Sequence, residues 1–155
     1  LYAGLMLTPD GPKVVEFNCR FGDPETQALL PLMASSLLTP MRAIARGESI
    51  ASMLPLTWHP GASVTTVVAA AGYPGPVRAG DAITVPPDHD GVTIFEAGPK
   101  RSAAGTVGTA GGRVVAATAV APTFAAARDA SAAAVRFEGA QFRRDIGWRE
   151  QARAG

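Results

Sequence analysis

The sequence predicts an α+β fold, in which an antiparallel hairpin plus helices precede a small mixed-sheet domain with a closing helix. Three observations predict this class. Near the N-terminus, two runs whose side chains alternate as in a strand flank a group of turn residues. Runs rich in Val and Thr lie between residues 63 and 120. After Pro122 comes an alanine-rich segment whose apolar residues recur at helical spacing. Prolines and a glycine interrupt residues 50–62. We therefore expect a linker there, between domains at 1–49 and 63–155.

Composition and charge exclude several classes of protein. The 155 residues are enough for one core, or for a partial lobe plus a small domain. The net charge of +1 gives no general electrostatic reason to bind nucleic acid or an anionic membrane. No apolar run reaches the roughly 18 residues of a membrane span. Cys19 is the only cysteine, so no internal disulfide forms, and we expect a reducing, cytoplasmic compartment.

The first element is expected to be a hairpin of residues 1–8 and 13–20. Both runs alternate, and the four residues Pro-Asp-Gly-Pro between them are strong turn formers. In the second run the odd positions are apolar and should face a core, which would make Cys19 a small buried hydrophobe. The even positions carry Val14 and then three polar side chains, Glu16, Asn18 and Arg20.

The polar face of this second strand is the candidate site. Glu16 and Asn18 are two residues apart, so their side chains leave the same face of a strand at Cα positions about 6.5–7 Å apart. Carboxylate and amide oxygens suit Mg²⁺, which usually takes one or two protein ligands. The Arg20 guanidinium could then donate paired hydrogen bonds to a phosphate or carboxylate group. The alternative is a solvated face of an edge strand with no ligand.

Two helices are expected next. Gly22 gives a turn, Asp23 is an N-cap candidate, and Pro24 suits the first turn of a helix running to about residue 34. Pro31 should kink or divide that helix. A second helix is expected over 37–46, capped by Ser35 or Ser36 and ended by Gly47. Its apolar stripe would be buried and contains Leu37, Leu38, Met41, Ile44 and Ala45.

The C-terminal part should contain strands and one long helix. Strands are expected over 63–71, around Ile83 and Val85, and over 92–97, with a second hairpin that joins 106–109 to 113–120. Thr123 should cap the last helix. The apolar positions of that helix recur at helical spacing and are Phe124, Ala127, Ala130 or Ser131, Ala134 and Val135. Beyond it lies a charged tail, either solvated or docked on another lobe, with Arg143, Arg144, Asp145 and Arg149.

The run Glu-Phe-Asn-Cys-Arg-Phe-Gly-Asp-Pro-Glu-Thr-Gln at 16–27 resembles the signature of the phosphoribosylamine–glycine ligase family, also called glycinamide ribonucleotide synthetases. This family belongs to the ATP-grasp superfamily. Three further runs, at 72–75, 111–114 and 142–147, lie in the order expected of the family's C-terminal portion. The resemblance therefore extends along essentially the whole chain. It implies that residues 1–49 are the C-terminal segment of an ATP-grasp lobe.

The resemblance implies a function for each residue of the motif. Such enzymes join glycine to 5-phosphoribosylamine at the expense of ATP in purine biosynthesis, through glycyl phosphate. Glu16 and Asn18 would hold Mg²⁺, or Mn²⁺ in its place, and Arg20 would stabilise the transferring phosphoryl group. Asp23 and Glu25 would bind substrate. Cys19 lies at a variable position of the motif.

The resemblance also implies that this chain is incomplete. The superfamily's ATP-clamping lysines and the N-terminal domain lie upstream of the metal strand, so we expect the chain to need the rest of the same protein and to be inactive alone. Two alternatives stay open. Another ATP-grasp carboxylate–amine ligase or carboxylase could share a Glu-x-Asn-x-Arg strand, although the continuing run 21–25 argues against it. In a different class, the chain could be a non-catalytic docking module.

Overall fold

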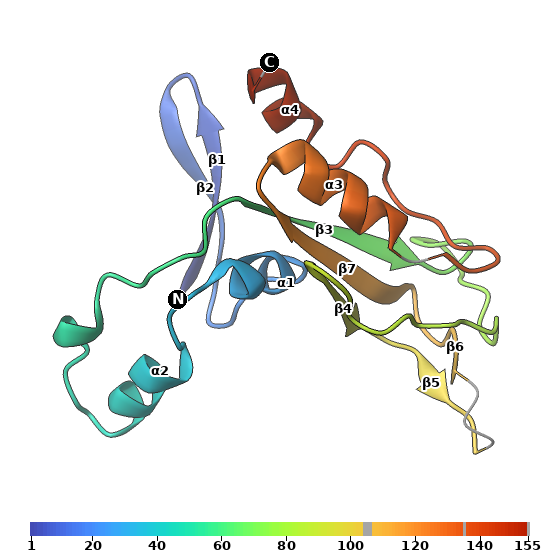
Figure 1. The fold of residues 1–155 in the computed structure, drawn as a ribbon, viewed down its shortest axis with the longest axis horizontal. Helices are drawn as coiled ribbons and strands as arrows, with labels where there is room; N and C mark the ends of the chain where they lie inside the picture. Colours follow the sequence, from blue (N-terminus) through green and yellow to red (C-terminus); the bar gives the residue numbers. More distant parts are fainter. Residues whose placement is uncertain (104–106, 135, 155) are drawn as a thin grey trace.

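The fold is taken from a computed structural model, which describes residues 1–103, 107–134 and 136–154. It begins with an isolated antiparallel hairpin of β1 (Tyr2–Thr8) and β2 (Gly11–Asn18). The hairpin extends away from the rest of the chain (Figure 1). The predicted hairpin is thus confirmed. Its second strand begins at Gly11 and ends at Asn18, each two residues earlier than expected, so that the turn comprises only Pro9 and Asp10.

A bulge in β2 changes which residues share a face. Gly4 lies opposite Glu16 but Leu5 lies opposite Val14, which leaves Val15 as the extra residue. Because paired residues point to the same side, Val14 joins Leu5 and Phe17 on the apolar face. The prediction that Val14 lies on the polar face is therefore wrong. Alternation alone could not reveal the inserted residue.

The segment after the hairpin is helical but weakly buried. It comprises α1 (Glu25–Leu29), the 3₁₀ turn η1 (Leu30–Leu32), α2 (Leu38–Ala45) and the 3₁₀ turn η2 (Ala51–Met53). Pro31 lies in η1 directly after α1, so the predicted division of the first helix is confirmed. Gly47 follows α2 with φ of +71°, as a helix-ending glycine should.

Two expectations about these helices are wrong. Neither Ser35 nor Ser36 caps α2: the N-cap residue is Leu37, and the Ser35 hydroxyl instead accepts a hydrogen bond from the Thr57 backbone N–H at 2.7 Å. The predicted apolar stripe is not buried either, since Leu38, Met41 and Ile44 are exposed. The buried residues of α2 are Pro40 and Ala43. Periodicity identified an amphipathic helix, but little of the described chain packs against its larger side chains.

The second part is built on a three-stranded antiparallel sheet of order β3-β7-β4, formed by β3 (Ala62–Ala69), β7 (Arg113–Ala121) and β4 (Val92–Glu96). β7 is central because its nearly continuous apolar sequence can be buried on both faces. The α+β class is confirmed. The expected hairpin of 106–109 with 113–120 is wrong, because β6 (Val107–Gly108) pairs with β5 (Lys100–Arg101); Thr106 lies outside the described residues. The strand expected around Ile83 is only a single bridge, between Ala82 and Gly108.

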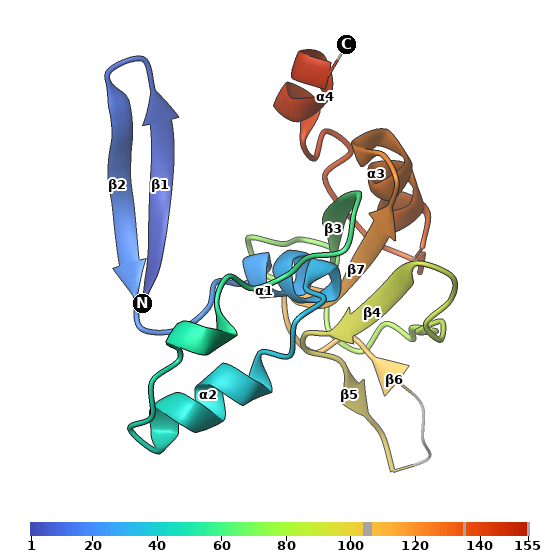
Figure 2. The same ribbon diagram turned by 60° about the vertical axis from the view of Figure 1, so that its left-hand side comes forward.

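One helix covers each face of this sheet. α3 (Phe124–Ala133) packs against β3 and β7, and α1 lies on the opposite face (Figure 2). The Thr123 hydroxyl accepts a hydrogen bond from the Ala126 N–H at 3.2 Å, so the predicted cap is confirmed. The Thr66 and Ser131 hydroxyls, both buried, join α3 to β3 at 2.9 Å. Val135, predicted to belong to this helix, lies outside the described residues.

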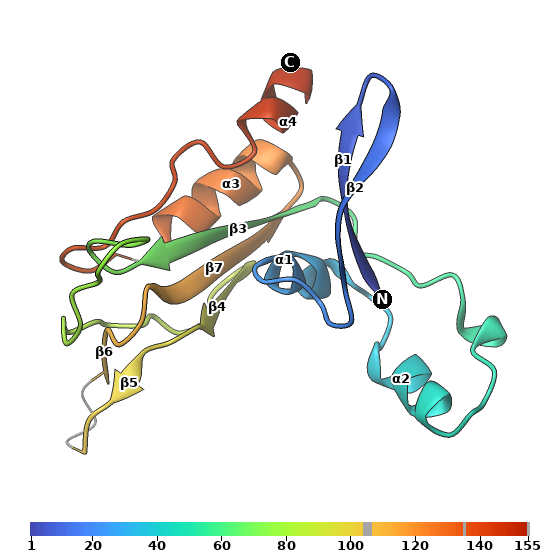
Figure 3. The ribbon, with the colours of Figure 1, turned by 180° about the vertical axis from the view of Figure 1, so that it is seen from behind.

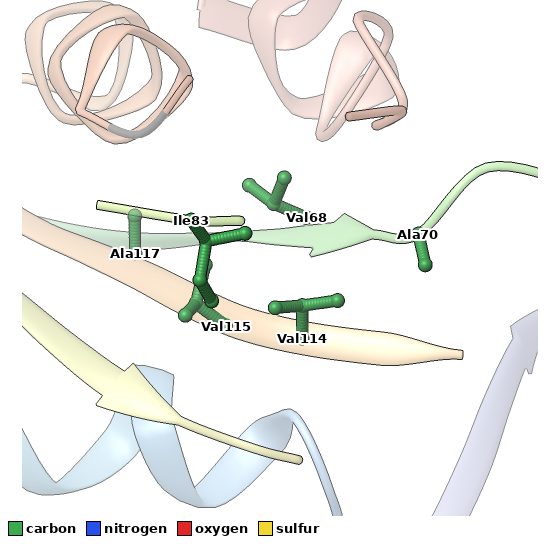
Figure 4. Close-up of a cluster of buried hydrophobic side chains, with 6 residues drawn as sticks. All are labelled: Val68, Ala70, Ile83, Val114, Val115 and Ala117. Atoms are coloured by element: carbon green, nitrogen blue, oxygen red, sulfur yellow. The ribbon is translucent and has the colours of Figure 1, made fainter. Parts of the chain in front are cut away.

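The core lies between the sheet and α3. Val114, Val115 and Ala117 of β7 are completely buried, and Val68 of β3 is nearly so. In Figure 4 the Val68 and Ala117 side chains point to the same side of the sheet, toward α3. On the other face, the Thr65 and Thr118 hydroxyls pair across the strands at 2.8 Å. Among the described helices, none is long and apolar enough to cross a membrane.

Candidate functional site

The candidate site starts on the polar face of the hairpin. The β1–β2 register places Tyr2 opposite Asn18 and Gly4 opposite Glu16, so these four residues share one face. Glu16 is exposed, and Asn18 is half-buried. A Cβ added to Gly4 would lie 3.1 Å from the Glu16 Cγ, because the glutamate side chain lies over this glycine. The two proposed metal ligands thus face the same way.

The opposite face of the hairpin is apolar and uncovered by the described residues. Phe17 is 62% exposed, Val14 54% and Leu7 76%. Cys19 is also exposed. The expectation that the odd positions of β2 pack into a core is therefore wrong for this chain. A two-stranded hairpin can bury only one layer of side chains, and it needs another element to cover them.

Arg20 lies in the turn that follows β2, and Glu25 is the first residue of α1. Because β2 ends at Asn18, strand alternation no longer determines where Arg20 points. Its guanidinium donates to the Phe21 carbonyl at 2.9 Å. The Glu25 carboxylate accepts a hydrogen bond from the Tyr2 hydroxyl at 3.1 Å, and this bond raises the pKa of Tyr2 above its usual value. A Cβ on Gly22 would collide with the Glu25 carboxylate.

Asp23 has a different role from the predicted cap. The N-cap position of α1 is occupied by Pro24, with no side-chain hydrogen bond. The Asp23 carboxylate instead lies 3.1 Å from an Arg113 guanidinium nitrogen and accepts from the Gln27 amide at 3.0 Å. Arg113 also donates to the Asp23 backbone carbonyl at 3.3 Å. The turn after β2 is thus attached to the first residue of β7.

A cavity of about 340 Å³ opens beside this turn. Its polar lining includes Tyr2, Glu25 and Ser63, and the rest is mainly apolar. The Ser63 hydroxyl is buried without a hydrogen-bond partner among the described residues. Sequence reasoning missed Tyr2 and Ser63. Pairing the two predicted strands across their turn would have placed Tyr2 near Asn18, whereas no sequence signal identified Ser63, which reaches the cavity only through tertiary packing.

Comparisons with known proteins cover both parts of this chain. Residues 63–149 match the family described as "Phosphoribosylglycinamide synthetase, C domain", and residues 1–26 match "Phosphoribosylglycinamide synthetase, ATP-grasp (A) domain". The first match alone spans more than half of the chain.

The chain belongs to the phosphoribosylglycinamide synthetase family.

Named relatives of this chain include a phosphoribosylamine–glycine ligase from Nostoc, which is 44% identical over an alignment of 155 residues that covers 96% of this chain and 36% of the relative. The trifunctional purine biosynthetic protein adenosine-3 from Homo sapiens is 43% identical over an alignment of 154 residues that covers 96% of this chain and 15% of that protein. A crystal structure of phosphoribosylamine–glycine ligase from Thermotoga maritima superimposes with a TM-score of 0.77 at 35% identity, covering 92% of this chain and 35% of that one. This chain thus spans about a third of the length of the single-function relatives.

The donor set of the synthetase motif fits a magnesium ion. Glu16 offers a carboxylate and Asn18 an amide on one face, which are the hard oxygen donors that Mg²⁺ takes. The Asn18 Nδ2 is buried and has no hydrogen-bond partner within the described residues, so no hydrogen bond of this nitrogen fixes the direction of the amide. In the described ranges, no three His, Cys, Asp or Glu side chains converge on one point. A magnesium ion held by Glu16 and Asn18 would therefore need substrate phosphates and water to complete an octahedral shell.

Proposed function

We propose that the protein containing this chain joins glycine to 5-phosphoribosylamine, giving glycinamide ribonucleotide, ADP and phosphate. The observation that carries the proposal is the shared face of Glu16 and Asn18, next to the start of α1, where Asp23 and Glu25 are held in place. The names of the relatives support the choice of substrates. The same names support a role in purine biosynthesis.

The reaction proceeds in two steps. A glycine carboxylate oxygen attacks the γ-phosphorus of ATP, and the bond from that phosphorus to the bridging oxygen breaks, releasing ADP and forming glycyl phosphate. The nitrogen of 5-phosphoribosylamine then attacks the acyl carbon, the carbon–oxygen bond to phosphate breaks, and a proton leaves the nitrogen. Both steps concentrate negative charge on phosphate oxygens, so positioning and charge neutralisation matter most.

Each motif residue has a proposed part in this reaction. Glu16 and Asn18 hold Mg²⁺, or Mn²⁺, which when bound neutralises the phosphate oxygens of ATP. The Arg20 guanidinium stabilises the transferring phosphoryl group. Glu25 binds substrate from the edge of its cavity. Asp23 contributes to the same substrate site while Arg113 fixes its position.

The chain is proposed to act only with the rest of its protein. We divide it into the C-terminal segment of the ATP-grasp domain at 1–49, a linker at 50–62, and a small α+β domain at 63–155. The exposed apolar face of the hairpin, with Leu7, Val14 and Phe17, suits packing against the preceding part of that domain. A cytoplasmic location stays a prediction.

The test measures phosphate release by the full-length protein with glycine, 5-phosphoribosylamine and Mg-ATP. Glu16→Gln should lower turnover at least about 100-fold, because a neutral amide binds Mg²⁺ far less well than a carboxylate. Glu48→Gln, an equal charge change at an exposed residue beyond α2, should leave turnover unchanged. Unaffected turnover in Glu16→Gln would overturn the catalytic proposal. In an enzyme reassembled from this chain and the separately made remainder of the protein, loss of association in Glu16→Ala without loss of turnover would favour the docking module.

A further inference from the structure

A hydrogen bond joins the base of the hairpin to the start of α1. The Tyr2 hydroxyl, at the beginning of β1, donates to the Glu25 carboxylate, 23 residues further along the chain, at 3.1 Å. Figure 3 shows this base next to α1, whereas the turn at the other end of the hairpin lies on the same side of the molecule as α4 (Trp148–Ala154). The bond is therefore a tertiary contact between two elements that carry proposed site residues.

Tyr2 belongs to the face of the hairpin that carries the proposed metal ligands. The strand register places Tyr2 opposite Asn18. Its ring and the Glu16 side chain both lie next to Gly4. A Cβ on this glycine would lie 3.1 Å from the Glu16 Cγ and 3.7 Å from the Tyr2 Cε1. The tyrosine side chain thus extends from the metal face to the carboxylate that is proposed to bind substrate.

Two contacts fix the Glu25 carboxylate. Glu25 is exposed, and an exposed glutamate without a partner samples several rotamers, which costs entropy when a ligand orders it. The Tyr2 hydroxyl holds the Oε1 atom, and the carboxylate lies so close to Gly22 that a Cβ on that glycine would collide with it. A carboxylate accepts up to about four hydrogen bonds, so capacity remains for a ligand in the cavity of about 340 Å³ that Tyr2 and Glu25 both line.

Asp23, the other carboxylate assigned to substrate, is occupied differently. One of its oxygens accepts from the Gln27 amide, and the other lies 3.1 Å from the Arg113 guanidinium. The negative charge of Asp23 is therefore balanced by a cation of the chain itself. The group that donates to Glu25 is a phenol, which is neutral at pH 7, so Glu25 keeps a negative charge for a cationic group of a substrate.

We propose that Tyr2 is a positioning residue, whose hydroxyl holds the Glu25 carboxylate ready to accept hydrogen bonds from the ammonium group of glycine. The inference rests on the proposed function, in which glycine presents its carboxylate to a phosphate on the metal face. Glycine carries an ammonium cation at neutral pH, and a charge-assisted hydrogen bond to a carboxylate is stronger than a neutral one. The phosphates of the other two substrates are anionic and would be repelled. A carboxylate that is oriented before glycine arrives loses less entropy on binding.

The first test measures phosphate release by the full-length protein while one substrate at a time is varied. Tyr2→Phe removes the hydroxyl and keeps the ring. The KM for glycine should rise about 5-fold, less than for loss of a direct hydrogen bond to a charged group, because the Glu25 carboxylate remains. The KM values for the other substrates, and kcat at saturating glycine, should change by less than about 2-fold, because the lost contact acts equally in the ground and transition states. Tyr73→Phe is the matched control: it alters the chain's other tyrosine, which does not line this cavity, and should leave every constant unchanged.

A double-variant cycle separates positioning from a merely structural role. Glu25→Gln removes the negative charge and should raise the KM for glycine about 30-fold. In that background Tyr2→Phe should add less than about 2-fold, because the hydroxyl acts only through the carboxylate. Factors that multiply in the double variant overturn the proposal. So does a KM for glycine that Tyr2→Phe leaves unchanged, or a rise in the KM for 5-phosphoribosylamine in its place.

Failure of this inference can be told apart from failure of the proposed function. If glycine-dependent phosphate release is normal in the unaltered protein but the cycle fails, the function stands and Tyr2 has no positioning role. If the unaltered protein releases no phosphate with glycine, the proposed function falls, and titration calorimetry with glycine decides about Tyr2: weaker binding in Tyr2→Phe supports the site, and equal or absent binding ends it.

Thermal unfolding checks that each variant keeps its fold. If Tyr2→Phe unfolds, Glu25→Asp is the second variant, because it shortens the side chain and breaks the same contact from the other partner. It should give the same selective rise in the KM for glycine. An unchanged KM would overturn the proposal.

Discussion

The β1–β2 hairpin and the β3–β7–β4 sheet both carry apolar side chains, but in opposite environments. β7 is an apolar strand in which Val114 and Val115 have no exposed surface. β2 presents Val14 and Phe17 on its apolar side, yet both are more than half exposed. Figure 1 shows the physical reason: helices cover both faces of the sheet, whereas the hairpin extends away from the rest of the chain. Apolar side chains contribute to stability only when another element removes them from water.

The largest expected effect comes from placing an aspartate in the sheet, compared with placing one in the hairpin. In the 155-residue chain, Val115→Asp should lower the free energy of unfolding of the C-terminal part by about 4 kcal/mol or more, because it places an unpaired carboxylate in the core. Val15→Asp should change it by less than about 0.5 kcal/mol, because that side chain is already in water. Urea unfolding followed by circular dichroism measures both. Equal losses would mean that the hairpin has a core of its own, and the contrast would be wrong.

A smaller effect is expected at the ion pair that joins the two regions. Asp23 and Arg113 are 3.1 Å apart and both are partly exposed, so a double-mutant cycle with Asp23→Asn and Arg113→Gln should give a coupling of about 0.5–1 kcal/mol. High salt should reduce this coupling. Hydrogen exchange of residues 19–25 should become faster in Arg113→Gln. The exposed Glu96–Arg101 pair lies within the sheet part, so Arg101→Gln is the control and should leave that exchange unchanged.

The smallest effect concerns the titration of Tyr2. Its hydrogen bond to Glu25 raises the pKa of the phenol above its ordinary value of about 10. Because folding raises this pKa, the stabilisation that the Tyr2–Glu25 hydrogen bond gives the folded state is complete below about pH 10. It disappears as the pH rises through the pKa of Tyr2 in the folded state. Glu25→Gln should lower the pKa of Tyr2, as measured by phenolate absorbance in a Tyr73→Phe background. A pKa that does not move would show that Glu25 does not hold this end of the hairpin.

Much of the local structure could be predicted because short-range chemistry determines it. The hairpin turn, which the structure confines to Pro9 and Asp10, the division of the first helix at Pro31 and the cap at Thr123 each depend on neighbours a few residues away. The family motif likewise identified Glu16 and Asn18, and the hairpin register places them on one face. Their service as metal ligands stays a proposal.

Contacts between distant residues could not be predicted in the same way. The sequence contained an apolar strand at 113–120, but only the folded sheet decides that it pairs with β3 and β4 and not with 106–109. The bulge at Val15 and the Asp23–Arg113 pair both depend on which segments meet in space. The sequence by itself therefore determined the first hairpin, the division at Pro31, the cap at Thr123, the main strands and the family of this chain, since these follow from local chemistry and from the motif. Only the tertiary structure decided what is buried, because burial depends on a partner surface that alternation does not specify.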